Sequence, residues 1–248
     1  MEFARRFFFA LCGCVAAVAT GCAIGTVVFA FAHDSYVIEL FTSQGCSHCP
    51  RADRWLAAIA RNPGTVAVSF PVDTWDYIGW RDTLASPAFT ARQKAYAAVN
   101  GNSRVYTPQA IVNGLTAAAG GDEAEIEQAI AKAKGVDGAM TVPMRLSKAD
   151  GHYSVEIAPG NNGPASVIVL RVARATTVQI QRGENAGKSI TYTNVVRTID
   201  KVGEWTGNTA TFSLPGATQD GEGFVVLVQK GTLERPGAIL AAVKSDGL

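Results

Sequence analysis

The sequence predicts an α/β fold for residues 33–136, followed by an antiparallel β-sandwich-like domain over residues 139–248. In the first part, apolar residues alternate between the two-residue period of strands and the spacing of amphipathic helices. In the second part helical periodicity disappears, and short β-rich runs are separated by turn residues. A length of 248 residues fits one large domain or two ordinary ones, and an apolar fraction of 48% is enough for a sizeable core.

The first part begins with a strand-like run over residues 36–41 and a helix-like run over residues 51–61. Residues 65–72 predict a second strand. A helix should begin at Ser86 and Pro87, because Ser is a good N-cap and Pro fits the first turn, and it should end near Val99.

A strand-strand-helix unit completes the first part. Residues 109–112 read as a short strand, Asn113-Gly114 is a strong hairpin turn, and residues 115–119 return as the partner strand. Asp122 caps a third helix that ends near Lys134. The predicted order is therefore strand-helix-strand-helix-strand-strand-helix.

The second part contains eight β-rich runs bounded by turn signals such as Asp150-Gly151 and Pro215-Gly216. This spacing is typical of an antiparallel sandwich. The predicted strands cover residues 140–147, 153–158, 165–174, 176–181, 189–197, 209–214, 224–230 and 238–243.

Two cysteines lie at the junction between the first strand and the first helix, in Cys46-Ser47-His48-Cys49-Pro50. A Cys-x-x-Cys at such a junction is the redox signature of thioredoxin-like folds, and the element order is that of the minimal thioredoxin fold. The helix N-terminus favours an anion, which lowers the thiol pKa of Cys46. We therefore predict an exposed dithiol in which Cys46 is the nucleophile and Cys49 the resolving thiol.

His48 lies between the two cysteines, where its imidazole could donate to the thiolate. Stabilising the reduced form in this way would make the pair a better oxidant. Thiol–disulfide chemistry of this kind needs no dissociable organic cofactor. The expected partner is a protein or a small molecule that carries a thiol or a disulfide.

Two other interpretations of the cysteine pair stay open: a structural disulfide, and a soft-metal site that holds copper(I). A disulfide that closes so short a loop would remove little chain entropy. A four-ligand zinc site is not expected, because no cysteine follows Cys49 and the other histidines are His33 and His152. Apart from the copper(I) alternative, the sequence predicts no resident metal.

Candidate substrate-binding residues lie in two later loops. Pro108 opens the third strand, where thioredoxin-like proteins carry a cis-proline that faces the cysteine pair, so we expect a cis bond after Thr107. The Thr107 backbone would then turn towards Cys46 and could pair with an extended substrate. Trp75 and Trp80 could wall the same groove.

Candidate proton relays lie on and after the first two strands. Asp73 follows the second strand at the edge where Cys46 follows the first, and ligands usually bind at that edge of open α/β sheets. Glu39, Asp73 or Asp76 could accept the proton of the resolving thiol. Alternatively Asp73, Asp76 and Asp82 could bind a cation, or they could simply cap the turns of an ordered loop.

The N-terminus predicts export. Arg5 and Arg6 precede an apolar run over residues 7–32 that ends in a small-x-small signal, so we expect a signal peptide cut after Ala32. A retained inner-membrane anchor over residues 7–32 and lipid attachment at Cys22 are alternatives. All three place the folded part outside the cytoplasm, periplasmic or secreted. The net charge of +1 gives no reason to expect nucleic acid or a second membrane contact.

Several blocks resemble a bacterial family of secreted, thioredoxin-like proteins of unassigned function. The resemblance implies an exported thioredoxin-like fold with a conventional cysteine pair, and it supplies no substrate. His48 and Arg51 stand where the family commonly has Ser and Pro, and both add positive charge near the thiols. The loop 183–187 is expected to be a sandwich hairpin or a ligand-facing segment. The matching blocks are residues 39–53, 72–82, 85–93, 106–109, 112–114, 183–187 and 194–197.

Overall fold

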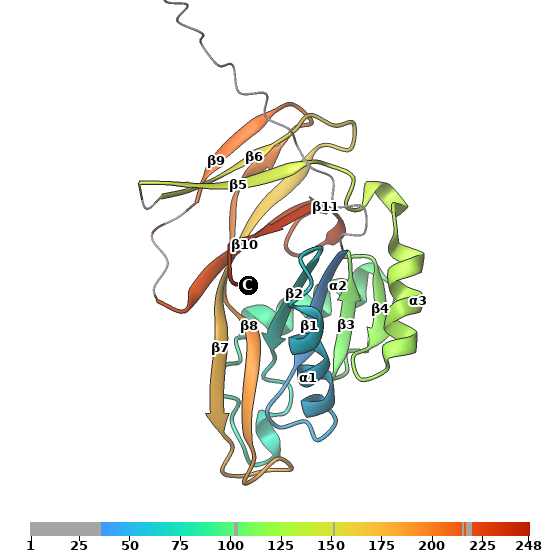
Figure 1. Ribbon diagram of the computed structural model, residues 1–248. Helices are drawn as coiled ribbons and strands as arrows, with labels where there is room; N and C mark the ends of the chain where they lie inside the picture. The colour runs from blue at the N-terminus through green and yellow to red at the C-terminus, as the bar shows by residue number, and fades with distance from the viewer. Residues whose placement is uncertain (1–35, 102–103, 151, 215, 217–219) are drawn as a thin grey trace, which may run out of the picture.

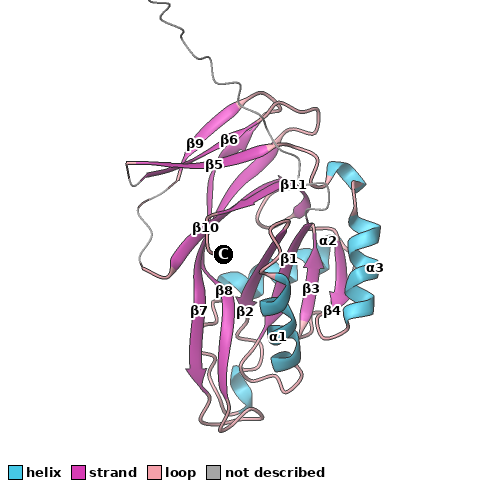
Figure 2. Cartoon of the chain, in the orientation of Figure 1, coloured by secondary structure: helices cyan, strands magenta, loops and turns pink. Residues whose placement is uncertain are grey.

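The computed structural model describes residues 36–101, 104–150, 152–214, 216 and 220–248 (Figure 1). Figure 2 separates the helices from the strands in the same orientation. The α-helices of the described part are α1 (Cys49–Ile59), α2 (Pro87–Val99) and α3 (Glu123–Ala133). The strands are β1 (Tyr36–Thr42), β2 (Thr65–Pro71), β3 (Gln109–Val112), β4 (Thr116–Ala119), β5 (Met144–Ala149), β6 (His152–Ile157), β7 (Ala165–Gln179), β8 (Ser189–Trp205), β9 (Ala210–Ser213), β10 (Glu222–Gly231) and β11 (Pro236–Lys244).

A mixed eight-stranded sheet organises the chain, in the order β11-β10-β7-β8-β2-β1-β3-β4. β1 and β2 are parallel, whereas β3 and β4 continue the sheet as an antiparallel hairpin. A second, three-stranded antiparallel sheet has the order β5-β6-β9. The predicted α/β character of the chain is confirmed.

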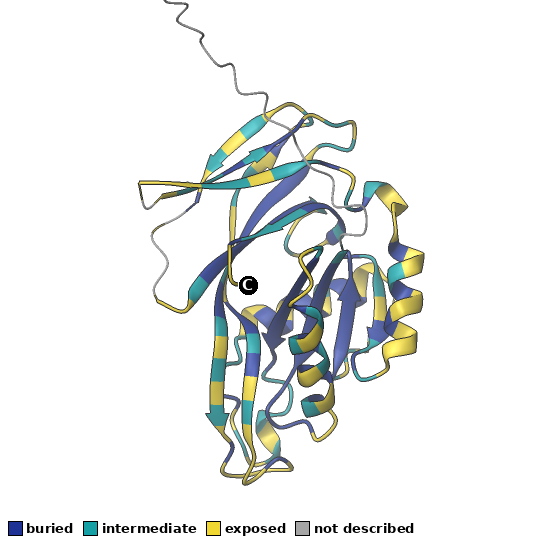
Figure 3. Cartoon of the chain, viewed as in Figure 1, coloured by how far each residue is buried: buried dark blue, intermediate teal, exposed yellow. Residues whose placement is uncertain are grey.

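Helices cover both faces of the N-terminal half of the large sheet, so β2 is buried throughout and β1 is buried from its second residue onward (Figure 3). Val37 and Phe41 of β1 join the core on the α2 side, with Phe89 and Tyr96. Successive strand residues point to opposite faces, so the intervening residues of β1 pack against α1 and α3 instead. Cores on both faces hold β1 and the loop after it in place.

The predicted separation of residues 139–248 into their own sandwich is only partly right. β7, β8, β10 and β11 extend the first sheet, and β8 lies beside β2 in parallel with Ser69 opposite Val195. A fully buried β2 needs a neighbour on its second edge, and β8 supplies it. The sandwich-like packing occurs farther along, where the small sheet covers β7, β10 and β11 around Trp205 and Phe224.

Two of the predicted strands are one. Residues 165–174 and 176–181 were expected as separate strands, but β7 runs continuously through Ala175, which pairs with Thr193 of β8. β8 also continues past Arg197 to Trp205. The long β7–β8 hairpin therefore reaches the end of the sheet at which the cysteine loop lies (Figure 1).

The predicted N-terminal segment, residues 1–32, lies outside the described residues. Within the described part of the chain, no helix combines the length and the apolar character needed to cross a bilayer.

Candidate functional site

Cys46 lies in the loop between β1 and α1, and Cys49 is the first residue of the helix. Two backbone hydrogen bonds shape this loop: the Cys46 N–H donates to the Ser43 carbonyl at 3.1 Å, and the Cys49 N–H donates to the Cys46 carbonyl at 3.2 Å. Both cysteines are free thiols.

The expectation that both sulfurs are exposed is not met. Cys46 is 5% exposed and Cys49 has no exposed surface, because the first turn of α1 directs it towards the sheet. The flanking residues Ser47 and His48 are exposed. An incoming molecule can therefore reach Cys46 first, and Cys49 only through Cys46.

The two thiols differ sharply in acidity. A hydrogen bond from Cys49 is the main cause that lowers the pKa of Cys46 to about 6; Thr107 and the backbone N–H groups of His48 and Cys49 add to it. Burial raises the pKa of Cys49 well above its ordinary value, and its hydrogen bond to Cys46 raises it further. One thiolate can thus form at neutral pH, and it forms on Cys46.

Thr107 contacts the Cys46 sulfur directly. Its carbonyl oxygen lies 3.5 Å from the Cys46 Sγ, and the Thr107–Pro108 peptide bond is cis. The Trp75 indole donates to the Thr107 hydroxyl at 2.6 Å, which leaves the hydroxyl proton free to point elsewhere. Thr107, Pro108 and Trp75 therefore lie together beside Cys46.

Trp80 contacts the cysteine loop through Gln44. Its indole donates to the Gln44 side chain at 2.8 Å, and the Gln44 N–H donates to the Asp82 carboxylate at 2.8 Å. The more exposed aromatic surface belongs to Tyr77, which is 78% exposed and whose ring centroid lies 6.2 Å from that of Trp75.

The predicted role of the His48 imidazole is not reproduced. Its Nδ1 lies 3.4 Å from the Ser47 hydroxyl, and the ring is exposed. The contribution of His48 to the acidity of Cys46 comes through its backbone N–H. A surface imidazole is held in place weakly, whereas the backbone of the first helical turn is fixed.

The buried carboxylate beside the thiols is Asp53, which the sequence reasoning did not single out. Asp53 lies four residues after Cys49, and such residues are neighbours on one helix face. Its Oδ1 accepts from the Thr42 hydroxyl at 2.7 Å, and its Oδ2 has no hydrogen-bond partner. Burial is the main cause that raises its pKa to about 8, and the Cys46 charge contributes.

Glu39, a predicted relay, belongs to a different site. It lies on the α2 side of β1, and its Oε1 accepts from the Arg92 Nη2 at 2.7 Å and from the Arg92 Nε at 3.0 Å. The same guanidinium donates to the Tyr96 hydroxyl and to Gln229. Glu39 is one residue out of phase with the face of β1 that meets α1, so it forms a structural ion pair instead.

The other predicted relays fix the loop after β2. Asp73 accepts from the Thr90 hydroxyl at 2.6 Å, and Asp76 accepts from the Asp82 N–H at 2.9 Å. Asp82 also accepts the N–H groups of Leu84 and Ala85. Asp76 and Asp82 therefore fix the turns of this loop, and Asp73 joins the loop to α2 through Thr90. Among the residues that the structure describes, no three His, Cys, Asp or Glu side chains are grouped so that they could hold a metal ion.

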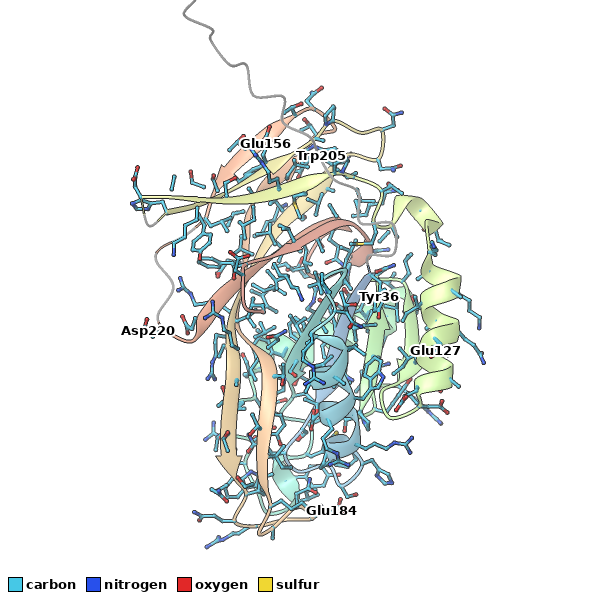
Figure 4. All side chains as sticks on the ribbon, viewed as in Figure 1. Tyr36, Glu127, Glu156, Glu184, Trp205 and Asp220 are labelled. Atoms are coloured by element: carbon cyan, nitrogen blue, oxygen red, sulfur yellow. The ribbon has the colours of Figure 1, made fainter. Side chains whose placement is uncertain are left out.

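The tip of the β7–β8 hairpin completes the site. The Asn185 side chain is fully buried and donates to the carbonyls of Gln44 and Cys46, both at 2.9 Å. Beside it, the Glu184 carboxylate accepts from the Ser47 N–H at 3.2 Å. Figure 4 shows Glu184 at the far end of this hairpin, at the same end of the molecule as the start of α1.

Comparison with known proteins places the chain in a family. The family model described as "Protein of unknown function (DUF1223)" matches residues 37–229, well over half of the chain. The chain belongs to the DUF1223 family. The crystal structure of Protein AGR_C_4864 from Agrobacterium tumefaciens is similar, with 34% sequence identity over 86% of this chain and 94% of that chain and a TM-score of 0.75.

A more distant match carries a functional name. A "Probable Thioredoxin" of Archaeoglobus fulgidus is 37% identical over 38 residues, which is 15% of this chain. The DUF1223 chain spans 42% of that relative. This match gives the family a thioredoxin-like hint through a short segment only.

Asp53 and Asn185 are the site residues that sequence reasoning missed. Asp53 carried a usable signal, since it lies on the same helix face as Cys49 and the buried Leu56. Asn185 lies in the loop 183–187, which was expected to be a sandwich hairpin or a ligand-facing segment. Nothing in the sequence indicated its contact with Cys46, 139 residues earlier.

Proposed function

We propose that this DUF1223 protein is a thiol–disulfide oxidoreductase on a thioredoxin-like α/β unit. The observation that carries the proposal is the pairing of an acidic Cys46 thiol with a shielded Cys49 thiol, next to a buried carboxylate with one oxygen that has no hydrogen-bond partner. The element order β1-α1-β2-α2-β3-β4-α3 and the short match to a probable thioredoxin support the same function.

The reaction needs two exchanges. The Cys46 thiolate attacks a substrate disulfide, a mixed disulfide forms on Cys46, and one substrate sulfur leaves as a thiolate. Cys49 then passes its proton to Asp53 and attacks the Cys46 sulfur. The second substrate thiolate leaves, the substrate is reduced, and Cys46–Cys49 becomes a disulfide. The reverse sequence oxidises a dithiol substrate.

Asp53 suits the second exchange. A carboxyl with a pKa of about 8 is partly ionised near neutral pH, and in the mixed disulfide Cys46 no longer carries the charge that helps to raise the Asp53 pKa, so Asp53 can accept the Cys49 proton. The unpaired Oδ2 of Asp53 has no competing hydrogen bond. Thr107 and Pro108 would contact the substrate backbone next to Cys46, and Trp75 would fix Thr107.

A redox titration of the cysteine pair tests the proposal. We expect a reduction potential between about −120 and −270 mV, the range of exchange catalysts, and no titration in Cys46→Ser. A potential below about −300 mV would identify a structural disulfide and contradict the proposal. Tight one-to-one copper(I) binding without exchange activity would contradict it in favour of metal delivery.

We also propose that the protein works outside the cytoplasm, as its N-terminal residues predict. N-terminal sequencing of the mature protein from fractionated cells tests this: a start at His33 in the exported fraction supports cleavage. A full-length cytoplasmic protein would contradict export.

A further inference from the structure

Backbone hydrogen bonds close the loop at the tip of the β7–β8 hairpin. The Ile180 N–H donates to the Lys188 carbonyl at 3.0 Å, and the Gly187 N–H donates back to the Ile180 carbonyl at 2.8 Å. All its side chains from Arg182 to Lys188 are exposed except Asn185, which is fully buried. A buried amide at the tip of an otherwise exposed hairpin indicates a specific contact.

Asn185 makes this contact with the loop that carries Cys46. The Asn185 Nδ2 donates to the carbonyl of Gln44 and to the carbonyl of Cys46 itself. The Lys188 ammonium donates to the Asn185 Oδ1 at 2.8 Å, which fixes the amide with its NH2 group towards the cysteine loop. One side chain thus binds two carbonyls of the cysteine loop, that of Cys46 and that of the residue two positions before it.

We propose that Asn185 is a positioning residue of the redox site, which holds the loop that carries Cys46 in a fixed orientation at the start of α1. This inference rests on the proposed function of Cys46. If Asn185 has this role, the C-terminal part of the chain contributes a residue to the redox site through the β7–β8 hairpin.

The physical reason lies in how the thiolate is stabilised. Backbone N–H groups of the first helical turn lower the pKa of Cys46, and they do so only while the turn keeps its orientation. Without the amide, the buried carbonyls of Gln44 and Cys46 would lose a donor, and the loop would rearrange to satisfy them. Lys188 adds a positive charge that polarises the amide in the favourable direction.

Three variants of the full chain test the role: Asn185→Ala, Lys188→Gln and the control Asn194→Ala. Asn194 is a buried β8 asparagine whose amide donates to the Ala67 carbonyl at 2.9 Å, so its loss also removes a buried donor. The readout is the rate at which an alkylating reagent labels Cys46 as a function of pH, resolved by mass spectrometry. A merely structural role would not move this titration.

We expect Asn185→Ala to raise the Cys46 pKa by about one unit, which slows alkylation about tenfold at about pH 5. Lys188→Gln should slow it about twofold in the same direction, and because Lys188 is exposed this variant folds even if Asn185→Ala does not. Asn194→Ala should leave the titration at its wild-type position while it lowers the unfolding free energy.

Wild-type alkylation profiles in both Asn185→Ala and Lys188→Gln would overturn the inference, as would an equal shift in Asn194→Ala. The proposed function can fail separately. If wild-type protein shows no exchange activity but Asn185→Ala still shifts the Cys46 titration, the oxidoreductase proposal is wrong and the positioning role of Asn185 is supported.

Discussion

Two buried carboxylates, Glu39 and Asp53, lie on opposite sides of the central sheet and differ in their hydrogen-bond partners. Glu39, on the α2 side, has the Arg92 guanidinium at 2.7 Å. Asp53, on the α1 side, has a hydroxyl as its hydrogen-bond partner and one oxygen without any. Both residues are almost fully buried.

The difference separates structure from chemistry. A buried carboxylate that is hydrogen-bonded to a cation holds its neighbours in place, at the cost of desolvating both charges. Asp53 is not hydrogen-bonded to a cation, and burial raises its pKa to about 8, so it can exchange a proton near neutral pH. The thiols lie beside this second carboxylate.

The largest effect on this comparison should come from Arg92→Met. Removal of the cation leaves Glu39 buried without a partner, and it also takes a donor from Tyr96 and Gln229. We expect a loss of about 3–5 kcal/mol in the unfolding free energy, measured by urea denaturation. The pKa of Cys46 should stay at its wild-type value. A shifted Cys46 pKa in this variant would show that the Glu39–Arg92 pair and the cysteine site are coupled, and would contradict the comparison.

Asp53→Asn should affect the reaction more than the fold. Without a proton acceptor, Cys49 should resolve the mixed disulfide about 100-fold more slowly. Quenched-flow experiments would then show the Cys46 mixed disulfide accumulating. Thr42→Val is the control, because it removes the hydrogen bond to Asp53 and keeps the carboxyl. Equal resolution rates in wild type and Asp53→Asn would remove Asp53 from the mechanism.

The same carboxyl predicts a pH dependence of stability. The pKa of Asp53 is raised from 3.8 to about 8 in the folded chain, so the native state keeps a proton that the unfolded state releases. This contribution is complete below about pH 4 and is lost as the pH rises to about 8. In Asp53→Asn the unfolding free energy should fall less steeply as the pH rises. At about pH 8 it should exceed that of the wild type by about 2 kcal/mol. Parallel stability curves for the two reduced proteins would contradict the raised pKa.

The smallest effect should come from Trp75→Phe. The variant loses the indole donor that fixes the Thr107 hydroxyl, a neutral hydrogen bond worth about 1 kcal/mol. Because Trp75 acts on Cys46 only through Thr107, a part of this energy should appear as a higher Cys46 pKa. Cys46 alkylation should therefore slow about twofold below about pH 6. Tyr77→Phe, which changes the neighbouring exposed ring, should have no such effect.

Local signals in the sequence predicted the elements well. The Ser86 hydroxyl accepts from the Ala88 N–H, and the Asp122 carboxylate accepts from the Glu125 N–H, as their capping patterns indicate. Asn113 and Gly114 both have positive φ, the conformation that a tight hairpin turn requires. Such features depend on neighbouring residues only.

Long-range pairings were not predictable in the same way. Alternating apolar residues in β8 favour a strand, but nothing in them specifies β2 as the neighbour. Glu39 reads like any carboxylate on a buried strand until Arg92, 53 residues later, is placed beside it. The β7–β8 hairpin was likewise predictable as a hairpin, and its contact with the cysteine loop was not.

The central claim is that Cys46 is a primed thiolate and Cys49 a shielded thiol. The most direct test is the alkylation rate of each cysteine in the reduced wild-type protein across pH, separated by mass spectrometry. We expect Cys46 to titrate with a pKa of about 6 and Cys49 to stay unlabelled at neutral pH. Equal labelling of both cysteines, or a Cys46 titration near its ordinary value of 9.0, would contradict the account.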